Sequence, residues 1–230
     1  MQYRLSRVVA GPALKLVGRP RITGAEHIPA AGPAILASNH LSVVDSIYLP
    51  YMVARPVTFA AKSEYFTGTS LKDRLIGAYL RSTNQLSTDR AGARAAQDML
   101  EAALAKLQAG ELFGIYPEGT RSPDGRLYRG RTGVGWLALH SGAPVIPVAM
   151  VGTDHIMPPG QRVPRPGKIT IIVGEPLTFA GYRDQPAGAR QRRAVTDEVV
   201  QAIQKLSGQE YVPVYASAHK EQLAAAKAAG

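Results

Sequence analysis

Short apolar runs alternate with longer segments of helical pattern along most of this 230-residue chain. Runs typical of buried strands lie at residues 33–38, 56–61, 85–87, 112–116, 145–151 and 168–173. Helical patterns lie between or after them, at residues 43–53, 71–80, 92–108, 132–140 and 190–206. Strands that alternate with helices indicate an α/β fold, so we expect a single mixed sheet flanked by helices.

The first 20 residues combine apolar side chains with arginine and lysine, which is typical of an amphipathic helix at a membrane interface. Gly11 and Pro12 predict a kink in it. The same pattern fits a helix packed on the protein's own core, and the sequence does not favour either reading. No apolar run approaches the roughly 18 residues that a membrane-spanning helix needs, and no convincing secretory signal is present.

The formal net charge of +10 predicts attraction to polyanions, of which nucleic acid and an anionic membrane surface are the usual ones. Nucleic acid is the less favoured partner, because the sequence has no helix-turn-helix spacing, zinc finger or RNA-binding motif. The absence of cysteine excludes disulfides, thiolate metal sites and a cysteine nucleophile. The five histidines show no metal-ligand spacing, so we expect no metal.

His40 and Asp45 follow directly after the first strand-like run. A histidine can take a proton from a hydroxyl, and a carboxylate can fix its tautomer and stabilise the imidazolium. On a regular helix the two would point about 140° apart, so they meet only if the chain turns between them. Ser42 and Asp45 form an N-cap and N3 pair, which predicts a helix that begins at Val43. A plain helix cap beside a surface histidine explains the same residues equally well.

A second polar motif, YPEGTRS at residues 116–122, ends another predicted strand, where α/β sheets place ligands. Gly119 allows a close backbone approach, and Arg121 offers a planar fork suited to phosphate. Glu118 is expected to orient that fork or to accept from a substrate hydroxyl. The bland alternative is a turn with a local Glu–Arg pair. The following loop carries three arginines, for which a solvated surface and a lipid headgroup contact are both open: Arg126, Arg129 and Arg131.

Together the two motifs resemble the His-x4-Asp and Pro-Glu-Gly-Thr-Arg blocks of the glycerolipid acyltransferase family, in particular the bacterial 1-acylglycerol-3-phosphate acyltransferases. Two further blocks fit in order, since STDR at residues 87–90 resembles the second and VIPV at 145–148 the fourth. Residues 84–88 lack the glycine and bulky apolar residues that usually precede the second block's arginine. Tyr116 stands where the family usually has Phe, and Arg131 where it often has lysine.

The resemblance implies a one-step transfer with His40 as general base and Asp45 as its orienting carboxylate. The hydroxyl of a lysophospholipid attacks the thioester of acyl-CoA or acyl carrier protein, with no cofactor besides this co-substrate. Backbone N–H groups near Gly119 are candidates to stabilise the oxyanion. The implied substrate-binding residues are Glu118, Gly119, Thr120, Arg121, Arg90, Lys62 and Arg131.

The residue patterns and the resemblance, which covers roughly residues 20–180, together divide the chain into an interface helix at residues 1–20, an acyltransferase domain at 21–207 and a tail at 208–230 with little core pattern. We expect a peripheral or monotopic protein at the cytoplasmic face of the cell membrane. One alternative keeps this chemistry on another lysophospholipid, a glycolipid or an aminolipid. A remote one is a non-enzymatic basic module that binds membrane or nucleic acid. The motifs carry no information on acyl chain length, donor, position acylated or oligomeric state.

Overall fold

The computed structural model describes residues 11–67, 70, 74, 77, 78, 80, 81, 85–88, 92–158, 160, 161, 163–182 and 188–229. Several predictions concern residues outside these ranges: Arg90, residues 1–10 of the expected interface helix and most of the expected helix 71–80. The side chain of Lys62 is likewise outside what the structure describes.

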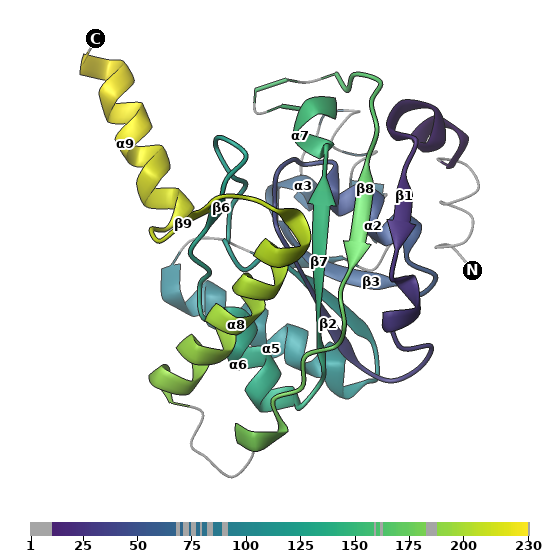
Figure 1. Ribbon diagram of the computed structural model, residues 1–230, viewed down its shortest axis with the longest axis vertical. Helices are drawn as coiled ribbons and strands as arrows, with labels where there is room; N and C mark the ends of the chain where they lie inside the picture. The colour runs from purple at the N-terminus through teal and green to yellow at the C-terminus, as the bar shows by residue number, and fades with distance from the viewer. Residues whose placement is uncertain are drawn as a thin grey trace.

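A seven-stranded sheet forms the centre of the molecule, in the order β1-β8-β7-β2-β5-β3-β4 (Figure 1). Neighbouring strands are parallel except β7 and β8, which are antiparallel, so the predicted mixed α/β sheet is confirmed. The strands are β1 (Arg21–Thr23), β2 (Ala34–Ser38), β3 (Val57–Lys62), β4 (Leu86–Thr88), β5 (Leu112–Ile115), β7 (Val145–Val151) and β8 (Thr170–Val173).

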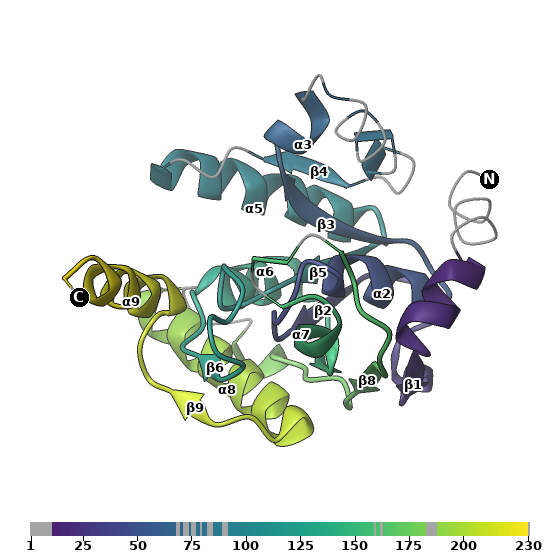
Figure 2. The same ribbon diagram turned by 90° about the horizontal axis from the view of Figure 1, so that it is seen from above.

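Helices cover both faces of the sheet (Figure 2). In the fully buried strand β2, Leu36 belongs to a core shared with α2 (Asp45–Met52), whereas Ile35 belongs to a core on the opposite face. That second core is built with α5 (Gly92–Gln108), α6 (Gly133–Ser141) and α8 (Ala189–Ser207). Alternate side chains of a strand point to opposite faces, so a strand covered on both sides reads as a continuous apolar run. Short helical turns complete the fold: α3 (Glu64–Thr67), α7 (Thr153–Ile156), η1 (Ala25–His27) and η2 (Ala180–Tyr182).

The C-terminal segment joins the body through a second, two-stranded sheet that the sequence did not reveal. Strand β6 (Leu127–Tyr128) pairs in parallel with β9 (Tyr211–Val212), and α9 (Ala216–Ala229) follows. Figure 1 shows α9 running away from the body towards the C-terminus. Its first residue, Ala216, is fully buried. The division of the chain at residues 20 and 207 stays a prediction.

Residues 11–18 form a helix that packs partly on the core. Leu14 and Val17 lie against the α2 side of the sheet, and Tyr48 donates a hydrogen bond to the carbonyl of Leu14. Leu16 points outward, with 74% of its surface exposed. Residues 11–18 thus bury part of their apolar surface on the core, and the interface-helix assignment stays a prediction. Among the described residues, the helices are all too short or too polar to cross a membrane.

The helix α2 begins at Asp45, not at Val43 as the capping pattern predicted. The Ser42 hydroxyl does not cap it, because it donates instead to the carbonyl of Met157, at 2.7 Å. Asp45 supplies the other half of a capping box, since its carboxylate accepts the Ser42 N–H at 2.8 Å. A partner 115 residues away in sequence thus takes the hydroxyl that local spacing assigned to the cap.

Candidate active site

The two sequence motifs meet at one edge of the sheet. Strands β2 and β5 are parallel neighbours, with Ala37 opposite Ile115. The chain after each strand therefore leaves from the same edge, as expected for parallel strands. The two loops also contact directly, because the Ser122 N–H donates to the carbonyl of His40 at 2.7 Å.

His40 and Asp45 form a hydrogen-bonded pair. The imidazole Nδ1 lies 2.9 Å from Asp45 Oδ2, and Asp45 is fully buried. The same carboxylate oxygen accepts the N–H groups of Leu41 and Ser42, both at 2.8 Å. Since a carboxylate accepts, Nδ1 carries the proton and Nε2 is left as the basic nitrogen. The turn at residues 41–44 brings together two side chains that a regular helix would hold apart.

Glu118 links its own loop, after β5, to the His40 loop after β2. Its side chain is buried, and its carboxylate accepts the N–H of His40 and the N–H of Tyr128, both at 3.0 Å. Burial is the main cause that raises the pKa of Glu118 to about 7, against the two backbone donors, which lower it. In the structure its two oxygens each accept one backbone N–H, from residues 78 and 10 positions away in sequence. The expectation that Glu118 orients Arg121 or accepts from a substrate hydroxyl stays a prediction.

Tyr116 lies against the imidazole, a contact that the sequence did not suggest. The two rings are stacked with centroids 3.9 Å apart. The Tyr116 hydroxyl lies 2.9 Å from the Ser46 hydroxyl, and Phe59 stacks on its far side at 5.2 Å. Burial raises the pKa of Tyr116 well above its usual value, so its hydroxyl stays protonated. In the sequence, the only sign of a special role at this position was that Tyr116 replaces the family's usual phenylalanine.

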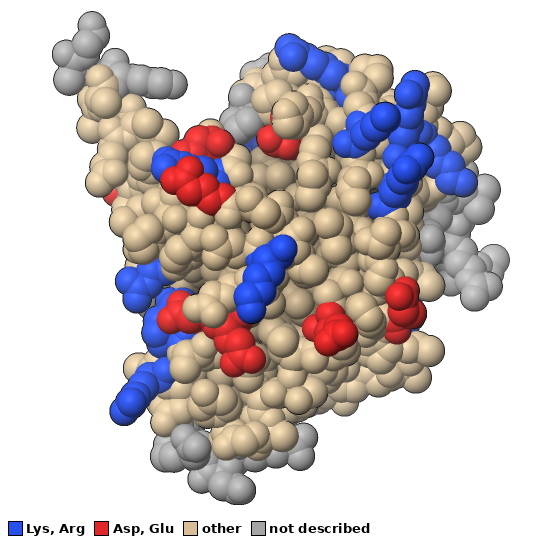
Figure 3. Space-filling view, viewed as in Figure 1, with Lys and Arg blue, Asp and Glu red and all other residues tan. Residues whose placement is uncertain are grey.

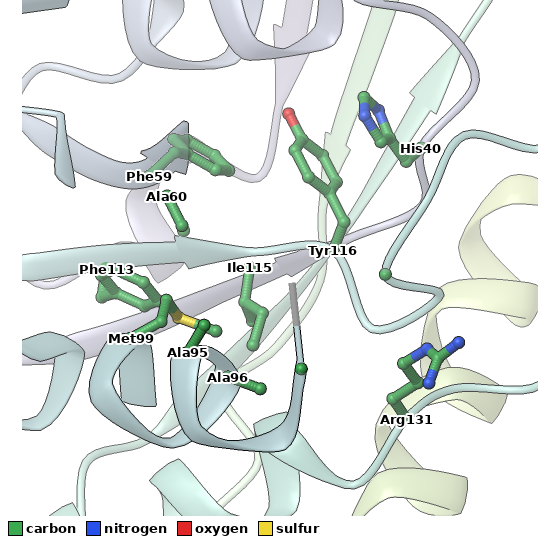
Figure 4. Close-up of a pocket in the computed structure, with 13 residues that line it drawn as sticks. His40, Phe59, Ala60, Ala95, Ala96, Met99, Phe113, Ile115, Tyr116 and Arg131 are labelled. Carbon is green, nitrogen blue, oxygen red and sulfur yellow. The ribbon is translucent and has the colours of Figure 1, made fainter. Parts of the chain in front are cut away.

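A pocket of about 520 Å³ opens beside His40 (Figure 4). Figure 4 shows His40 and Arg131 on one side of it and the apolar side chains on the other. The apolar lining includes Phe59, Ala95, Ala96, Met99 and Ile115. The size falls in the range of ligand pockets, and the polarity suits a molecule with a charged head and an apolar chain.

Cationic side chains lie against the glycine turn of the second motif, which spans residues 116–119. Gly119 has a φ of +72°, and an added Cβ would lie 2.9 Å from the Cδ of Arg131, so that side chain runs across the turn. The Gly119 N–H donates to the carbonyl of Tyr116 at 3.0 Å, which removes it as an oxyanion donor. Thr120 accepts from Lys220 of α9 at 2.8 Å. Sequence reasoning missed Lys220, because it is 100 residues from its partner.

The three arginines of the following loop have different surroundings. Arg126 forms an ion pair with Asp124, two residues earlier in the same loop, at 2.6 Å. Arg129 and Arg131 both lie over the ring of Tyr215, at 5.6 and 5.3 Å. Of the three, Arg131 alone lines the pocket. A solvated loop thus describes Arg126 better than a headgroup contact does.

The loop before His40 is fixed by Asn39, another residue that sequence reasoning did not single out. The Asn39 amide exchanges hydrogen bonds with the backbone of Met150, at 2.7 and 3.0 Å. It also donates to the Gln209 side chain at 2.8 Å, and Gln209 donates to the carbonyl of Gly125 at 2.6 Å. Gln209 therefore connects the His40 loop to the loop after the second motif. Within the described ranges, His, Asp and Glu side chains form no cluster of three suited to a metal ion.

Comparisons with known proteins find similar chains and a similar fold. A family model described as acyltransferase matches residues 19–151. The chain is 30% identical over 158 residues to a chloroplast 1-acyl-sn-glycerol-3-phosphate acyltransferase of Arabidopsis thaliana, covering 68% of this chain and 43% of that one. It is 29% identical to the enzyme of the same name from Bacillus subtilis, covering 84% and 90%.

A solved structure also resembles this fold. The crystal structure of the 1-acyl-sn-glycerophosphate acyltransferase of Thermotoga maritima aligns with a TM-score of 0.69 and 29% identity, covering 89% of this chain and 79% of that one. The chain spans less than half the length of the Arabidopsis relative, but most of the Bacillus and Thermotoga ones.

Proposed function

Because this chain belongs to the acyltransferase family, we propose that it transfers a fatty acyl group from acyl-CoA or acyl carrier protein to the free hydroxyl of 1-acylglycerol 3-phosphate, giving phosphatidate. The observation that carries the proposal is the His40–Asp45 pair at 2.9 Å beside a pocket that is apolar on one side and cationic on the other. Relatives named for this activity support the same acceptor.

In the proposed reaction His40 Nε2 takes the proton of the acceptor hydroxyl, and the oxygen attacks the thioester carbonyl carbon. The carbon–sulfur bond then breaks, and the departing thiolate takes the proton from the imidazolium. Asp45 holds the Nδ1 proton throughout and stabilises the imidazolium charge. The apolar side of the pocket receives a fatty chain, and Arg131, which lines the pocket, binds the acceptor phosphate together with the neighbouring Arg121 of the second motif. No cofactor is required, because a thioester is already activated.

We place this reaction at the cytoplasmic face of a membrane, to which the protein binds peripherally. The helix 11–18 and the segment after it are hydrogen-bonded to residues 167–169. Leu16 of this helix and Val163, four residues before Gly167, each expose 74% of their surface. Four basic residues lie beside them: Lys15, Arg19, Arg165 and Lys168. Figure 3 shows lysine and arginine gathered at the upper right, around the upper ends that β1 and β8 have in Figure 1. Apolar side chains among cations suit an anionic lipid surface.

The decisive experiment supplies mixed acyl donors and a panel of acceptors to the protein and identifies the products by mass spectrometry. We expect phosphatidate as the main product, and none from His40→Ala at an unchanged melting temperature. A preference for another lysophospholipid, a glycolipid or an aminolipid would keep the chemistry and replace the acceptor. Full turnover by His40→Ala would contradict the assignment of the base. Tight duplex-DNA binding at physiological salt, without transfer to any lipid, would favour the non-enzymatic alternative.

A further inference from the structure

Helix α9 brings a lysine and a serine to the glycine turn of the second motif. Lys220 Nζ donates to the Thr120 hydroxyl at 2.8 Å, and the Ser217 hydroxyl, one turn earlier, accepts from Arg131 at 3.0 Å. Figures 1 and 2 both show α9 beside the segment that contains β6. Lys220 and Ser217 both lie beyond residues 19–151, so the family match assigns them no role.

Three cationic side chains therefore surround this turn. The Arg131 chain crosses Gly119, Lys220 binds Thr120, and Arg121 is the next residue. In the part of the chain that the structure describes, none of these three cations has a carboxylate within 4.0 Å. Like charges held together repel one another, and a bound anion relieves that repulsion.

The electrostatics of Lys220 match an anion site. Partial burial and then the charge of Arg121 lower the pKa of Lys220, and Glu118 opposes them. Glu118 is a weak counter-ion here, because burial raises its own pKa to about 7 and backbone N–H groups occupy its oxygens. A phosphate beside Lys220 would favour the charged ammonium and strengthen its hydrogen bond.

We propose that Lys220 is a substrate-binding residue which, together with Arg121, holds the phosphomonoester of the acyl acceptor. The inference rests on the proposed function and assigns part of the acceptor site to α9. The turn is close to the proposed base, since His40, Gly119 and Arg131 line one pocket and Ser122 contacts the His40 carbonyl. In 1-acylglycerol 3-phosphate the reacting hydroxyl and the phosphate are on neighbouring carbons. In acyl-CoA the whole pantetheine arm separates the thioester from the nearest phosphate, so the cluster fits the acceptor better.

Binding tests this without turnover. Isothermal titration calorimetry with a soluble short-chain 1-acylglycerol 3-phosphate compares the wild type with Lys220→Gln, Lys220→Arg and a control, Lys205→Gln, on the exposed end of α8. We expect Lys220→Gln to weaken binding about tenfold, Lys220→Arg to recover most of it and the control to match the wild type. The matching monoacylglycerol, which has no phosphate, should bind all four proteins equally. Unchanged affinity of Lys220→Gln for the phosphorylated probe, or an equal loss for both probes, overturns the proposal.

Kinetics separate the two possible sources of phosphate. We expect Lys220→Gln to raise the KM for the acceptor about tenfold while kcat and the KM for acyl-CoA stay near wild-type values. A raised KM for acyl-CoA with an unchanged acceptor KM would assign the cluster to the donor and overturn the proposal. A wild-type protein that binds the phosphorylated probe but transfers no acyl group contradicts the proposed function alone, because the calorimetric result for Lys220 still stands.

Discussion

The ring of Tyr116 lies almost parallel to the imidazole of His40, with centroids 3.9 Å apart and planes inclined by 10°. Asp45 holds the same imidazole through Nδ1. A ring against its face and a hydrogen bond at its edge together fix the direction of Nε2. Tyr116 therefore positions the proposed base and takes no proton itself.

This contact predicts different results for two substitutions of Tyr116. Tyr116→Phe keeps the stacking and loses only the bond to Ser46, so we expect activity within about threefold of wild type. Tyr116→Ala removes the stacked ring, and we expect kcat to fall about tenfold or more with a smaller change in KM. Steady-state assays of both variants measure this. Equal losses would mean that the hydroxyl, not the ring, is what matters.

Asp45→Asn should separate the effect of the Asp45 charge on His40 from the role of its side chain in holding the turn. The asparagine oxygen can still accept the N–H groups of Leu41 and Ser42, so we expect a folded protein with a small loss of stability. Without the carboxylate charge the imidazolium is not stabilised, and activity should fall by on the order of 10⁴-fold. Thermal melting and turnover are measured on the same sample. A variant that unfolds would show that Asp45 mainly supports the turn.

Glu118 predicts a pH dependence of stability. Burial raises its pKa from 4.5 to about 7, so ionisation costs the folded protein more than the unfolded chain. The free energy of unfolding should therefore fall as pH rises from about 4.5 to about 7, by on the order of 3 kcal/mol from this group. Urea titrations across this range should show the slope, and Glu118→Gln should lack it. The exposed Glu101→Gln on α5 is the matched control and should keep it.

A side chain added at Gly114 is expected to change the acyl chain length that the pocket accepts. A Cβ at this position would lie 2.2 Å from the ring of Phe59, which lines the pocket. We expect Gly114→Ala to push that ring into the pocket, to cost about 1–3 kcal/mol of stability and to favour shorter acyl donors. The double variant Gly114→Ala, Phe59→Leu should recover the longer chains. Gly181→Ala, where no atom lies within 4 Å of the new methyl, should leave the profile unchanged. An unaltered profile in Gly114→Ala would place the fatty chain elsewhere.

The exposed side chains of Leu16 and Val163 are expected to contribute to membrane binding. Replacing both with aspartate removes two exposed apolar side chains and adds negative charge beside basic residues. We expect binding to anionic liposomes to fall at least tenfold in co-sedimentation, since both apolar burial and attraction to anionic lipid are lost. Leu223→Asp on α9 is the control, because Leu223 is also exposed but lies on another element. Equal binding by the double variant would contradict the proposed surface.

The regular elements were readable from the sequence because each has a strong local pattern. The predicted bounds of α5 and β7 agree with the structure, since an Ala- and Leu-rich helix stopped by Gly110 and a long apolar strand leave little ambiguity. The meeting of His40 and Asp45 was also expected. The predicted Ser42 cap was wrong, because the Ser42 hydroxyl donates to the distant carbonyl of Met157 and α2 starts at Asp45.

The contacts that complete the site could not be read in this way. Strands β6 and β9 have two residues each, too few for any periodicity. Glu118 was paired with Arg121 by proximity in sequence, whereas its oxygens serve His40 and Tyr128. Lys220 and Gln209 lie in a segment without a clear core pattern, and their side chains bind partners at least 84 residues away.

The bridge of Gln209 has a consequence for biosynthesis. The His40 loop leaves the ribosome early, but the amide that ties it to Gly125 is translated some 170 residues later. Lys220 follows later still. A nascent or prematurely terminated chain thus contains His40, Asp45 and the whole second motif without the clamp between their loops. We expect the proposed acyl transfer to begin only after translation has passed these residues.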